Sequence, residues 1–489
     1  MVFSGLVFLL AFLPANLICY FCAKTIKTRN IILLLFSLVF YAWGEPVYVL
    51  LLLAMSFSCW FFSRLIDNSG SDAARKAAMT GAAVVCIGAI GYFKYIGFIV
   101  ENINGLIGHE AIPVPQVALP IGISFYTFQL LTYVVDVYRG EVPAQKSFWK
   151  VLLYAGLFHQ CVAGPIVRYG DVENELTERY STLDGIYNGI GRFCFGLAKK
   201  AVLANACGAV VDALLITDAE IGNASHLAAN ISALSGRSAL TLWMGMAFFM
   251  LQIYLDFSAY SDMAIGMGLI CGFHYKENFN YPYVASSVTD FWRRWHMSLG
   301  TFFRDYVYIP LGGNRKGKAR QIFNMFVVWA LTGLWHGASW NFVLWGLYFF
   351  VLLVLEKLIL LKFYEKHRGL GIVATLTAVY FGWIFFKFTD LSLVKTVLKG
   401  MFCLNGNSFS TFESRSFALS YLFFFIIAVL ACTPLAKNIG ALLKKKSAYT
   451  PALKTVTTVW DAVIPAFMFV ISCLSLVGDS YNPFLYYQF

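Results

Sequence analysis

Charged residues are scarce in this chain. Of its 489 residues only 13% are Asp, Glu, Lys or Arg, whereas 59% are hydrophobic and 17% are aromatic. The length alone would allow roughly two to four soluble domains, but this composition excludes them and predicts a polytopic membrane protein. The net charge of +11 need not indicate nucleic acid, because Lys and Arg concentrate in short loops between apolar runs, as they do in cytoplasmic loops of membrane proteins.

Motifs of several other protein classes are missing as well. The chain has no Walker loop and no GxSxG elbow, so neither a P-loop nucleotide site nor an α/β-hydrolase nucleophile is predicted. Cys19 and Cys22 form a single CxxC without a second pair, which implies neither a disulfide framework nor a metal site. No internal repeat, direct or inverted, is visible, and this weighs against the common transporter designs.

What the chain does have is a succession of apolar runs. They predict an all-α membrane protein with about ten to twelve crossings and additional re-entrant segments. The runs occupy residues 2–21, 31–43, 47–66, 77–98, 121–138, 186–216, 238–257, 259–273, 321–334, 340–361, 370–388, 416–435 and 459–477.

The distribution of basic residues predicts the orientation. Lys24, Lys27 and Arg29 follow the first run, which places that connection in the cytoplasm and the N-terminus outside. No basic segment precedes the first run, so we expect it to be a membrane helix rather than a cleaved signal. Continued along the chain, the same rule places Lys444 to Lys446 in the cytoplasm and the C-terminus outside.

Two histidines, His296 and His336, bracket a basic segment. Between residues 291 and 320 there are seven Lys or Arg against one acid, Asp305, which is a cytoplasmic signature. The apolar run 321–334 has 14 residues, so as a helix it would be about 21 Å long against a hydrocarbon core of about 30 Å. We therefore expect it to stop inside the membrane, at a polar, glycine-flanked apex that carries His336.

An ionisable residue at that depth is a functional candidate by default, and the flanking glycines favour this role for His336 over that of a buried structural histidine. A desolvated, neutral imidazole would suit proton abstraction from a hydroxyl group. The basic segment would suit an anionic, phosphate-bearing donor from the cytoplasm, or alternatively the headgroups of membrane lipids. Forty residues separate the two histidines and no third ligand is near, so no metal site is predicted.

Other polar residues interrupt the apolar sequence. His159 lies in a short piece that could be re-entrant, but nothing nearby in the sequence completes a site. Asp256 and Asp262 are six residues apart and so lie on different helix faces. We expect them to pair with Arg293 or Arg294 rather than to act together as general acid and base.

Six stretches carry a resemblance to a known family. They are WHGASWNFVLWG, DFWRRWHMSLGTFFRDYVYIPLGG, MVFSGLVFLLAFLP, FYAWGEP, PIGISFYTFQ and VAGPIVR. With them the chain resembles the membrane-bound O-acyltransferase (MBOAT) family, from residue 1 to about 350. The branch is the bacterial cell-envelope one, typified by the membrane subunit of alginate O-acetylation.

The resemblance implies a fold and a set of site residues. A ring of tilted helices would surround a central funnel that thins the membrane, where a cytoplasmic acyl thioester meets an acceptor from the other side. His336 would be catalytic and His296 the second characteristic position. The acyl donor would be acetyl-CoA, as a substrate rather than a bound cofactor. The residues assigned to donor binding are Arg293, Arg294, Arg304 and Asn341.

The resemblance also implies a location and an internal division. The protein would be a multi-pass protein of the bacterial inner membrane, while the distribution of basic residues is what places both termini outside. It would form a single integral-membrane domain over residues 1–489. Its parts would be N-terminal helices at 1–140, a catalytic core with re-entrant segments at 141–361, C-terminal helices at 362–477 and an extracytoplasmic acyl-carrier tail at 478–489.

The last six residues, FLYYQF, look like the C-terminal F-x-Y-x-x-F motif of envelope acylation systems, in which the tyrosine is thought to carry the acyl group. This resemblance implies a catalytic role for Tyr486, whereas an interfacial anchor is the alternative for an aromatic tail. The expected reaction is acetylation of Tyr486 by acetyl-CoA with His336 as the base. A separate extracytoplasmic acyltransferase of the SGNH type would then acetylate a polysaccharide.

Two other functions remain open at this stage. D-alanyl transfer to teichoic acid is the alternative within the family, but those membrane subunits are usually shorter and take the tyrosine motif from a separate small protein. A transporter or flippase for a polysaccharide precursor is the alternative outside it. The missing repeats and the apex around His336 argue against transport.

Overall fold

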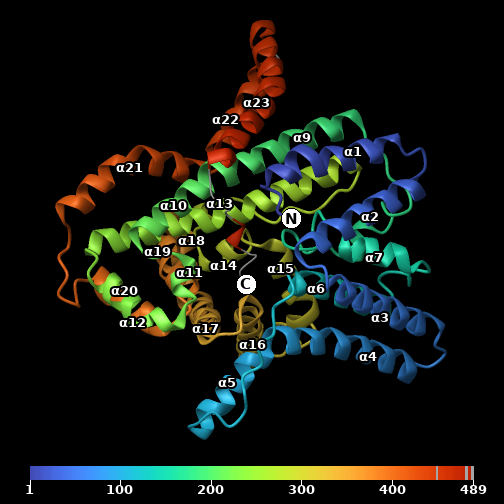
Figure 1. The fold of residues 1–489 in the computed structure, drawn as a ribbon, viewed down its shortest axis with the longest axis horizontal. Coiled ribbons are helices and arrows are strands. Elements are labelled where there is room, and N and C mark those ends of the chain that lie inside the picture. Colours follow the sequence, from blue (N-terminus) through green and yellow to red (C-terminus); the bar gives the residue numbers. More distant parts are fainter. Residues whose placement is uncertain (448–449, 479–482, 486–489) are drawn as a thin grey trace. The chain divides into compact units, whose positions relative to one another are not determined.

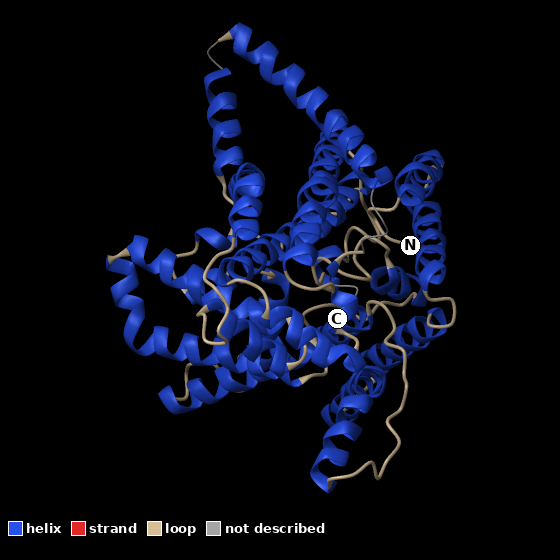
Figure 2. Cartoon of the chain, turned by 60° about the vertical axis from the view of Figure 1, so that its left-hand side comes forward, coloured by secondary structure: helices blue, strands red, loops and turns tan. Residues whose placement is uncertain are grey.

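The computed structural model describes residues 1–447, 450–478 and 483–485. Within these ranges every regular element is a helix, as Figure 2 shows. Nine helical segments of this described part are long and apolar enough to cross a membrane, and one further apolar helix, Phe8–Cys22, is shorter. The prediction of an all-α polytopic membrane protein is confirmed, with nine candidate spans in the described residues against the ten to twelve crossings expected.

The chain divides into two compact units. Unit 1 comprises Met1–Leu197, Tyr260–Glu277 and Leu476–Phe489. Its helices are η1 (Phe8–Phe12), α1 (Leu13–Cys22), α2 (Ile26–Gly44), α3 (Val49–Asn68), α4 (Asp72–Ile90), η2 (Gly91–Tyr95), α5 (Ile96–Ile107), α6 (Ile123–Arg139), α7 (Phe148–Gly156), α8 (Tyr169–Val172), α9 (Leu183–Ala198) and the end of α13 (Ala239–Cys271).

Unit 2 comprises Ala198–Ala259 and Asn278–Ser475. It contains most of α13 and of α23 (Pro451–Gly478). Its other helices are η3 (Lys199–Ala204), α10 (Asn205–Leu214), α11 (Asp218–Ile221), η4 (Ala224–His226), α12 (Leu227–Ser235), η5 (Pro282–Val284), α14 (Val288–Trp292), α15 (Met297–Phe303), η6 (Arg304–Tyr308), α16 (Lys318–His336), α17 (Trp340–Leu355), η7 (Glu356–Leu360), α18 (Leu361–Lys366), α19 (Arg368–Lys387), α20 (Leu391–Met401), α21 (Phe412–Ala431) and α22 (Leu435–Ser447).

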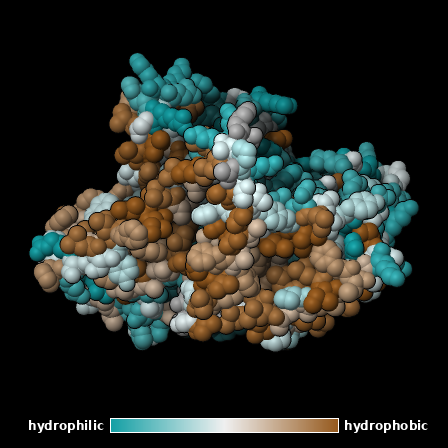
Figure 3. All heavy atoms as spheres, turned by 90° about the horizontal axis from the view of Figure 1, so that it is seen from above, coloured by the Kyte–Doolittle hydropathy of each residue, from teal (hydrophilic) through white to brown (hydrophobic). Residues whose placement is uncertain are grey.

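Several membrane-length helices leave their apolar side chains exposed. Only 11% of the apolar window of α21 and 6% of that of α23 are buried within the protein. Figure 3 shows apolar residues over much of the face that it draws. Such a surface would promote aggregation in water, but in a bilayer it contacts lipid tails that are equally apolar.

Helix α13 differs from the sequence prediction. The runs 238–257 and 259–273 were expected as separate segments, and this is wrong, because one unbroken helix covers residues Ala239–Cys271. The polar residues Asp256, Ser258 and Asp262 interrupt the hydropathy but not the helix. Each of these side chains has a polar partner on another helix. The helix can therefore continue through them without leaving a polar group unpaired in apolar surroundings.

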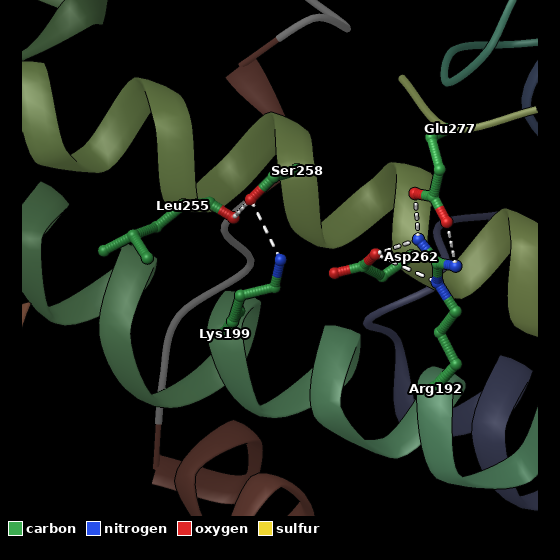
Figure 4. Close-up of polar contacts among 6 residues, drawn as sticks. All are labelled: Arg192, Lys199, Leu255, Ser258, Asp262 and Glu277. Atoms are coloured by element: carbon green, nitrogen blue, oxygen red, sulfur yellow. Dashed lines mark hydrogen bonds and ion pairs between the residues drawn. The ribbon is translucent and has the colours of Figure 1, made fainter. Parts of the chain in front are cut away.

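The partners of these polar residues are also not those predicted from the sequence. In unit 1, Arg192 of α9 donates to Asp262 at 2.9 Å and to Glu277 at 2.5 Å, and Figure 4 shows both carboxylates turned toward its guanidinium. In unit 2, Lys200 of η3 forms a buried ion pair with Asp256 at 2.7 Å, and Lys199 donates to Ser258 at 3.0 Å.

These contacts overturn the expected pairing of the two aspartates with Arg293 or Arg294. A charge buried in an apolar helix bundle requires a partner within hydrogen-bonding distance. Arg192 and Lys200 supply it from the neighbouring α9 and η3, which sequence distance does not reveal.

Helices α16 and α17 form the hairpin predicted for the stretch around His336 (Figure 1). α16 begins before the apolar run and ends after it, so its 19 residues are about 28 Å long. The two helices cross with their backbones in contact. A Cβ added at Gly346 would lie 2.3 Å from the carbonyl oxygen of Trp329, and one at Gly333 would lie 2.4 Å from that of Phe342. Glycine at these positions therefore allows the close approach.

Gly346→Ala is expected to destabilise the hairpin. The added methyl group forces α17 away from α16, and overpacking of this kind costs about 1–3 kcal/mol. We expect a lower melting temperature in detergent micelles and reduced activity. Gly440→Ala is the matched control, because a Cβ at Gly440 of α22 meets nothing within 4 Å. Equal melting temperatures for the two variants would contradict the packing described for α16 and α17.

Candidate functional site

His336 is the last residue of α16. The helix stops there because Gly337 is extended, and Ser339 then forms the N-cap of α17. The His336 side chain is 3% exposed, and the ring centroids of Trp345 and Phe386 lie 4.9 and 5.2 Å from that of the imidazole. The polar, glycine-flanked apex thus holds a buried imidazole whose orientation is restricted by aromatic packing.

A cavity of about 550 Å³ lies beside α16 in unit 2, within the size range of small-molecule sites. α14, α15, η6 and α16 contribute to its lining. Thr332, one of the lining residues, precedes His336 by one helical turn, so both side chains lie on one side of α16. The lining includes Trp292, Arg293, Trp295, His296, Arg304 and Trp329.

The four residues predicted to bind the donor fall into two groups. Arg293 and Arg304 both line the cavity and are exposed. Arg294 is not part of the lining, and its guanidinium pairs with Asp290 at 2.9 Å. Arg304 is also paired, with Asp305 at 2.6 Å, so an ion pair by itself does not separate the two groups. Asn341 is not part of the lining either, since its Nδ2 donates to a main-chain oxygen of α19 at 2.9 Å and so ties α17 to that helix.

The cavity therefore combines two exposed guanidinium groups with a buried imidazole and apolar walls. Guanidinium groups bind phosphate oxygens with paired hydrogen bonds. Trp292, Trp295 and Trp329 make part of the wall aromatic. This arrangement suits an elongated ligand with an anionic end near solvent and a reactive or neutral end inside.

His296 is the N-cap of α15 and has an uncommon backbone conformation. Its φ is +44° and its ψ is 54°, the left-handed region that costs a non-glycine residue about 1–2 kcal/mol. Such strain persists only where surrounding contacts hold it, and it is frequent at functional sites. Here the main-chain oxygen of Asn278 accepts from the N–H of Met297 at 2.9 Å, and the Asn278 side chain lies 3.1 Å from Nδ1 of His296.

Glu356 holds the short helix α14 in place. Its buried carboxylate accepts hydrogen bonds from the main-chain N–H groups of Val288 and Thr289, at 2.5 and 3.0 Å. These N–H groups belong to the first turn, where a helix has no internal acceptors for them. Through α14, Glu356 fixes the position of Trp292 and Arg293 at the cavity. The sequence offered no signal for this contact, since Glu356 reads as one more charge at a helix end.

The described end of the tail packs against the protein. In unit 1, Phe484 is 1% exposed, and its ring meets that of Tyr260 edge to face at 5.0 Å. Phe3 stacks on the same tyrosine at 4.6 Å, and Leu485 is buried as well. An interfacial anchor would expose such a ring, so its burial favours a tail docked on the protein. Tyr486 itself lies outside the described residues.

The remaining titratable candidate from the sequence is His159. It is fully buried in unit 1, with Nδ1 3.2 Å from the hydroxyl of Tyr275. In the described part of the chain, no three side chains from His, Cys, Asp and Glu come together in a group that could hold a metal ion.

Comparison with known proteins places these residues in a wider context. The family model described as MBOAT, membrane-bound O-acyltransferase family, matches residues 139–394, which include both histidines and every residue that lines the cavity. Over the full length of both chains, this chain is 34% identical to a protein of Azotobacter vinelandii named probable alginate O-acetylase AlgI.

Two further relatives carry other names. The chain is 30% identical to a peptidoglycan O-acetyltransferase of Helicobacter pylori, over 83% of this chain and 81% of that protein. It is 27% identical to a teichoic acid D-alanyltransferase of Bacillus subtilis, over 55% of this chain and 68% of that protein.

Proposed function

The chain belongs to the membrane-bound O-acyltransferase family and is a multi-pass membrane O-acyltransferase, and from this premise we propose the reaction that it catalyses. It moves an acetyl group from cytoplasmic acetyl-CoA across the bacterial inner membrane for O-acetylation of an extracytoplasmic polysaccharide. One observation carries this proposal. Arg293, Arg304 and the buried imidazole of His296 line one cavity, and Thr332 of the same lining lies one turn of α16 before His336.

The breadth of the similarity supports acetyl over D-alanyl as the transferred group. The proteins named O-acetylases or O-acetyltransferases align over 83–100% of this chain, whereas the D-alanyltransferase of Bacillus subtilis aligns over 55%. D-alanyl transfer remains the second candidate, because that similarity is to the same family.

In the proposed first step, the thioester of acetyl-CoA is attacked by the hydroxyl oxygen of Tyr486. His336 takes the hydroxyl proton as the new C–O bond forms at the carbonyl carbon. The C–S bond then breaks, and the leaving thiolate takes the proton from the imidazolium. The products are acetyl-Tyr486 and the free thiol of CoA, and His336 is neutral again.

In the proposed second step, a separate extracytoplasmic acyltransferase of the SGNH type accepts the group. Its nucleophilic hydroxyl attacks the acetyl-tyrosine ester, the ester C–O bond breaks, and the tyrosine hydroxyl is restored. That partner then acetylates the polysaccharide.

The double variant Arg293→Ala/Arg304→Ala tests the donor. We expect its KM for acetyl-CoA to rise about 10- to 100-fold, since hydrogen bonds to charged groups contribute about 1.5–3 kcal/mol. The KM for acetyl-pantetheine, which lacks the nucleotide and its phosphates, should stay within about twofold of the wild-type value. The measurement is steady-state release of free thiol with the partner acyltransferase and its polysaccharide present, because the acetyl group must leave Tyr486 before a second donor molecule can react.

Arg320→Ala is the matched control for this experiment. Arg320 lies in the same basic segment but does not line the cavity, so neither donor should be affected. Equal losses with both donors in the double variant would contradict phosphate recognition at the cavity. Turnover of a D-alanyl carrier protein in place of acetyl-CoA would reverse the choice between the two candidate functions.

A further inference from the structure

A groove with apolar walls lies in unit 2 between α13, α19 and α21. Two adjoining cavities of about 420 and about 360 Å³ form it, and both are lined by Trp243, Ala247, Tyr380 and Phe425. Along α21 the lining runs from residue 418 to residue 429. At 1.5 Å per residue this is about 16 Å, close to one leaflet, which is half of a hydrocarbon core of about 30 Å.

The polar side chains of the larger cavity already have partners within the protein. Each hydroxyl and each indole N–H of its lining donates to a main-chain oxygen. The donors are Trp243 to Met401, Tyr283 to Met250, Thr377 to Val373, Tyr380 to Trp243 and Thr433 to Leu430. A polar ligand would have to give up its water for few new hydrogen bonds, so an apolar ligand fits the groove best.

The groove opens toward the bilayer. α13, α19 and α21 all belong to segments of membrane-spanning length, and Thr377 and Val429 of the lining are exposed. α21 meets α13 through aromatic rings, with the centroids of Phe424 and Phe425 6.1 and 5.3 Å from that of Phe248. Packed proteins leave few voids larger than a water molecule, so we expect a hydrocarbon chain to fill the space beside these rings.

A basic residue lies at one end of the groove. Tyr283 and Thr433 line that end, and Lys437 follows Thr433 by one helical turn. Nζ of Lys437 lies 6.0 Å from the ring centroid of Tyr281, next to the lining residue Tyr283. α21 ends at Ala431, so the exposed Lys437 lies near the membrane surface.

The sequence around this end carries charge of one sign. Residues 414–460 contain no Asp or Glu but six basic residues, which are Arg415, Lys437, Lys444, Lys445, Lys446 and Lys454. Basic residues beside a membrane span attract anionic lipid headgroups. The groove thus offers apolar walls along its length and a cation at one end, the two features of a phospholipid site.

We propose that the groove binds one acyl chain of a glycerophospholipid, and that Lys437 pairs with the anionic headgroup of the same molecule. The lipid fills the space between α21 and the helices α13 and α19 and so ties α21 to them. This site shares no lining residue with the cavity beside α16. It is a second ligand site, and it does not depend on the acyl-transfer reaction.

Native mass spectrometry tests the bound lipid directly. The purified protein is stripped of lipid in detergent and then supplied with phosphatidylglycerol or with phosphatidylcholine that has the same acyl chains. We expect one phosphatidylglycerol molecule to be retained on each chain. Retention of phosphatidylcholine should be about fivefold lower, the effect of one cation near an anionic headgroup.

Ala247→Trp tests the groove, because Ala247 lines both cavities and the larger side chain would occupy the place of the acyl chain. Bound lipid should fall by about tenfold or more, while melting temperature and helix content show that the protein is folded. Val470→Trp is the matched control, since Val470 of α23 is exposed and lines neither cavity. Equal retention in a folded Ala247→Trp protein and in the wild type would overturn the proposal.

Lys437→Gln tests the headgroup at an exposed position where folding is not at risk. We expect the preference for phosphatidylglycerol over phosphatidylcholine to disappear. Lys445→Gln, an exposed change on the same helix α22, should keep that preference. A wild-type protein that retains both lipids equally would overturn the role of Lys437. A dimer of this chain without bound lipid would show that a second copy covers the groove, and would overturn the site itself.

Discussion

His336→Gln lowers acetyl transfer by about 10²- to 10⁴-fold, the range that a general base contributes, while the protein keeps its fold. Glutamine approaches the volume of histidine, so it fills most of the space beside the rings of Trp345 and Phe386. His336→Ala should lose the same activity and some stability as well, because it leaves a cavity among those rings. The measurement is the rate of thiol release from acetyl-CoA, with melting temperature and helix content recorded for each variant.

The result for kcat decides between the two roles open to this histidine. A structural histidine would give variants whose activity falls only in proportion to the folded fraction. A base would give a folded protein with background activity. Full activity in a folded His336→Gln protein would contradict the assignment of His336 as the base.

Tyr486→Phe abolishes the covalent acetyl-enzyme and, with it, acetylation of the polysaccharide by the partner. The change removes only the hydroxyl oxygen that would carry the acetyl group, so the loss should be complete rather than partial. The measurement is radiolabel retained on the protein after denaturation, following incubation with acetyl-labelled CoA. Binding of acetyl-CoA, measured separately, should be unchanged.

The neighbouring tyrosine provides the matched control for this variant. Tyr487→Phe removes a hydroxyl from the next residue of the same tail and should leave the label in place. Label that persists in Tyr486→Phe and disappears in Tyr487→Phe would move the carrier by one residue. Label that persists in both would remove the tail from the reaction.

The sequence located the deep histidine because its signals are local. The basic segment before residue 321, the apolar run and the glycines around His336 all lie within about 45 residues of one another. Hydropathy and charge therefore sufficed to predict a hairpin with His336 at its turn. The length of α16 was underestimated, since helical geometry extends through basic residues that hydropathy excludes.

The partners of buried charges were not predictable in the same way. Asp256 pairs with Lys200, which is 56 residues away, and Asp262 pairs with Arg192, which is 70 residues away. Hydropathy registered only that α13 carries polar residues in its middle. Which helix packs against that face depends on the whole fold, so the predicted pairing with Arg293 or Arg294 failed.

Prediction from the sequence also failed for residues that are close together in the chain, as the lining of the cavity shows. Arg293 lines the cavity and Arg294 does not, although they are adjacent. Their directions depend on the phase of α14, a helix of five residues whose first turn is held by Glu356. Asn278 was missed because its contact with His296 requires the left-handed turn at that histidine, which no spacing in the sequence indicates.

The measurement that tests the central claim most directly is peptide mass analysis of the purified protein after incubation with isotope-labelled acetyl-CoA. We predict one labelled acetyl group on Tyr486 in the wild-type protein and none in His336→Gln. That pair of results would establish the donor, the base and the carrier together. A folded wild-type protein without an adduct, or with the acetyl group on a residue outside the tail, would contradict the acetyl-tyrosine mechanism.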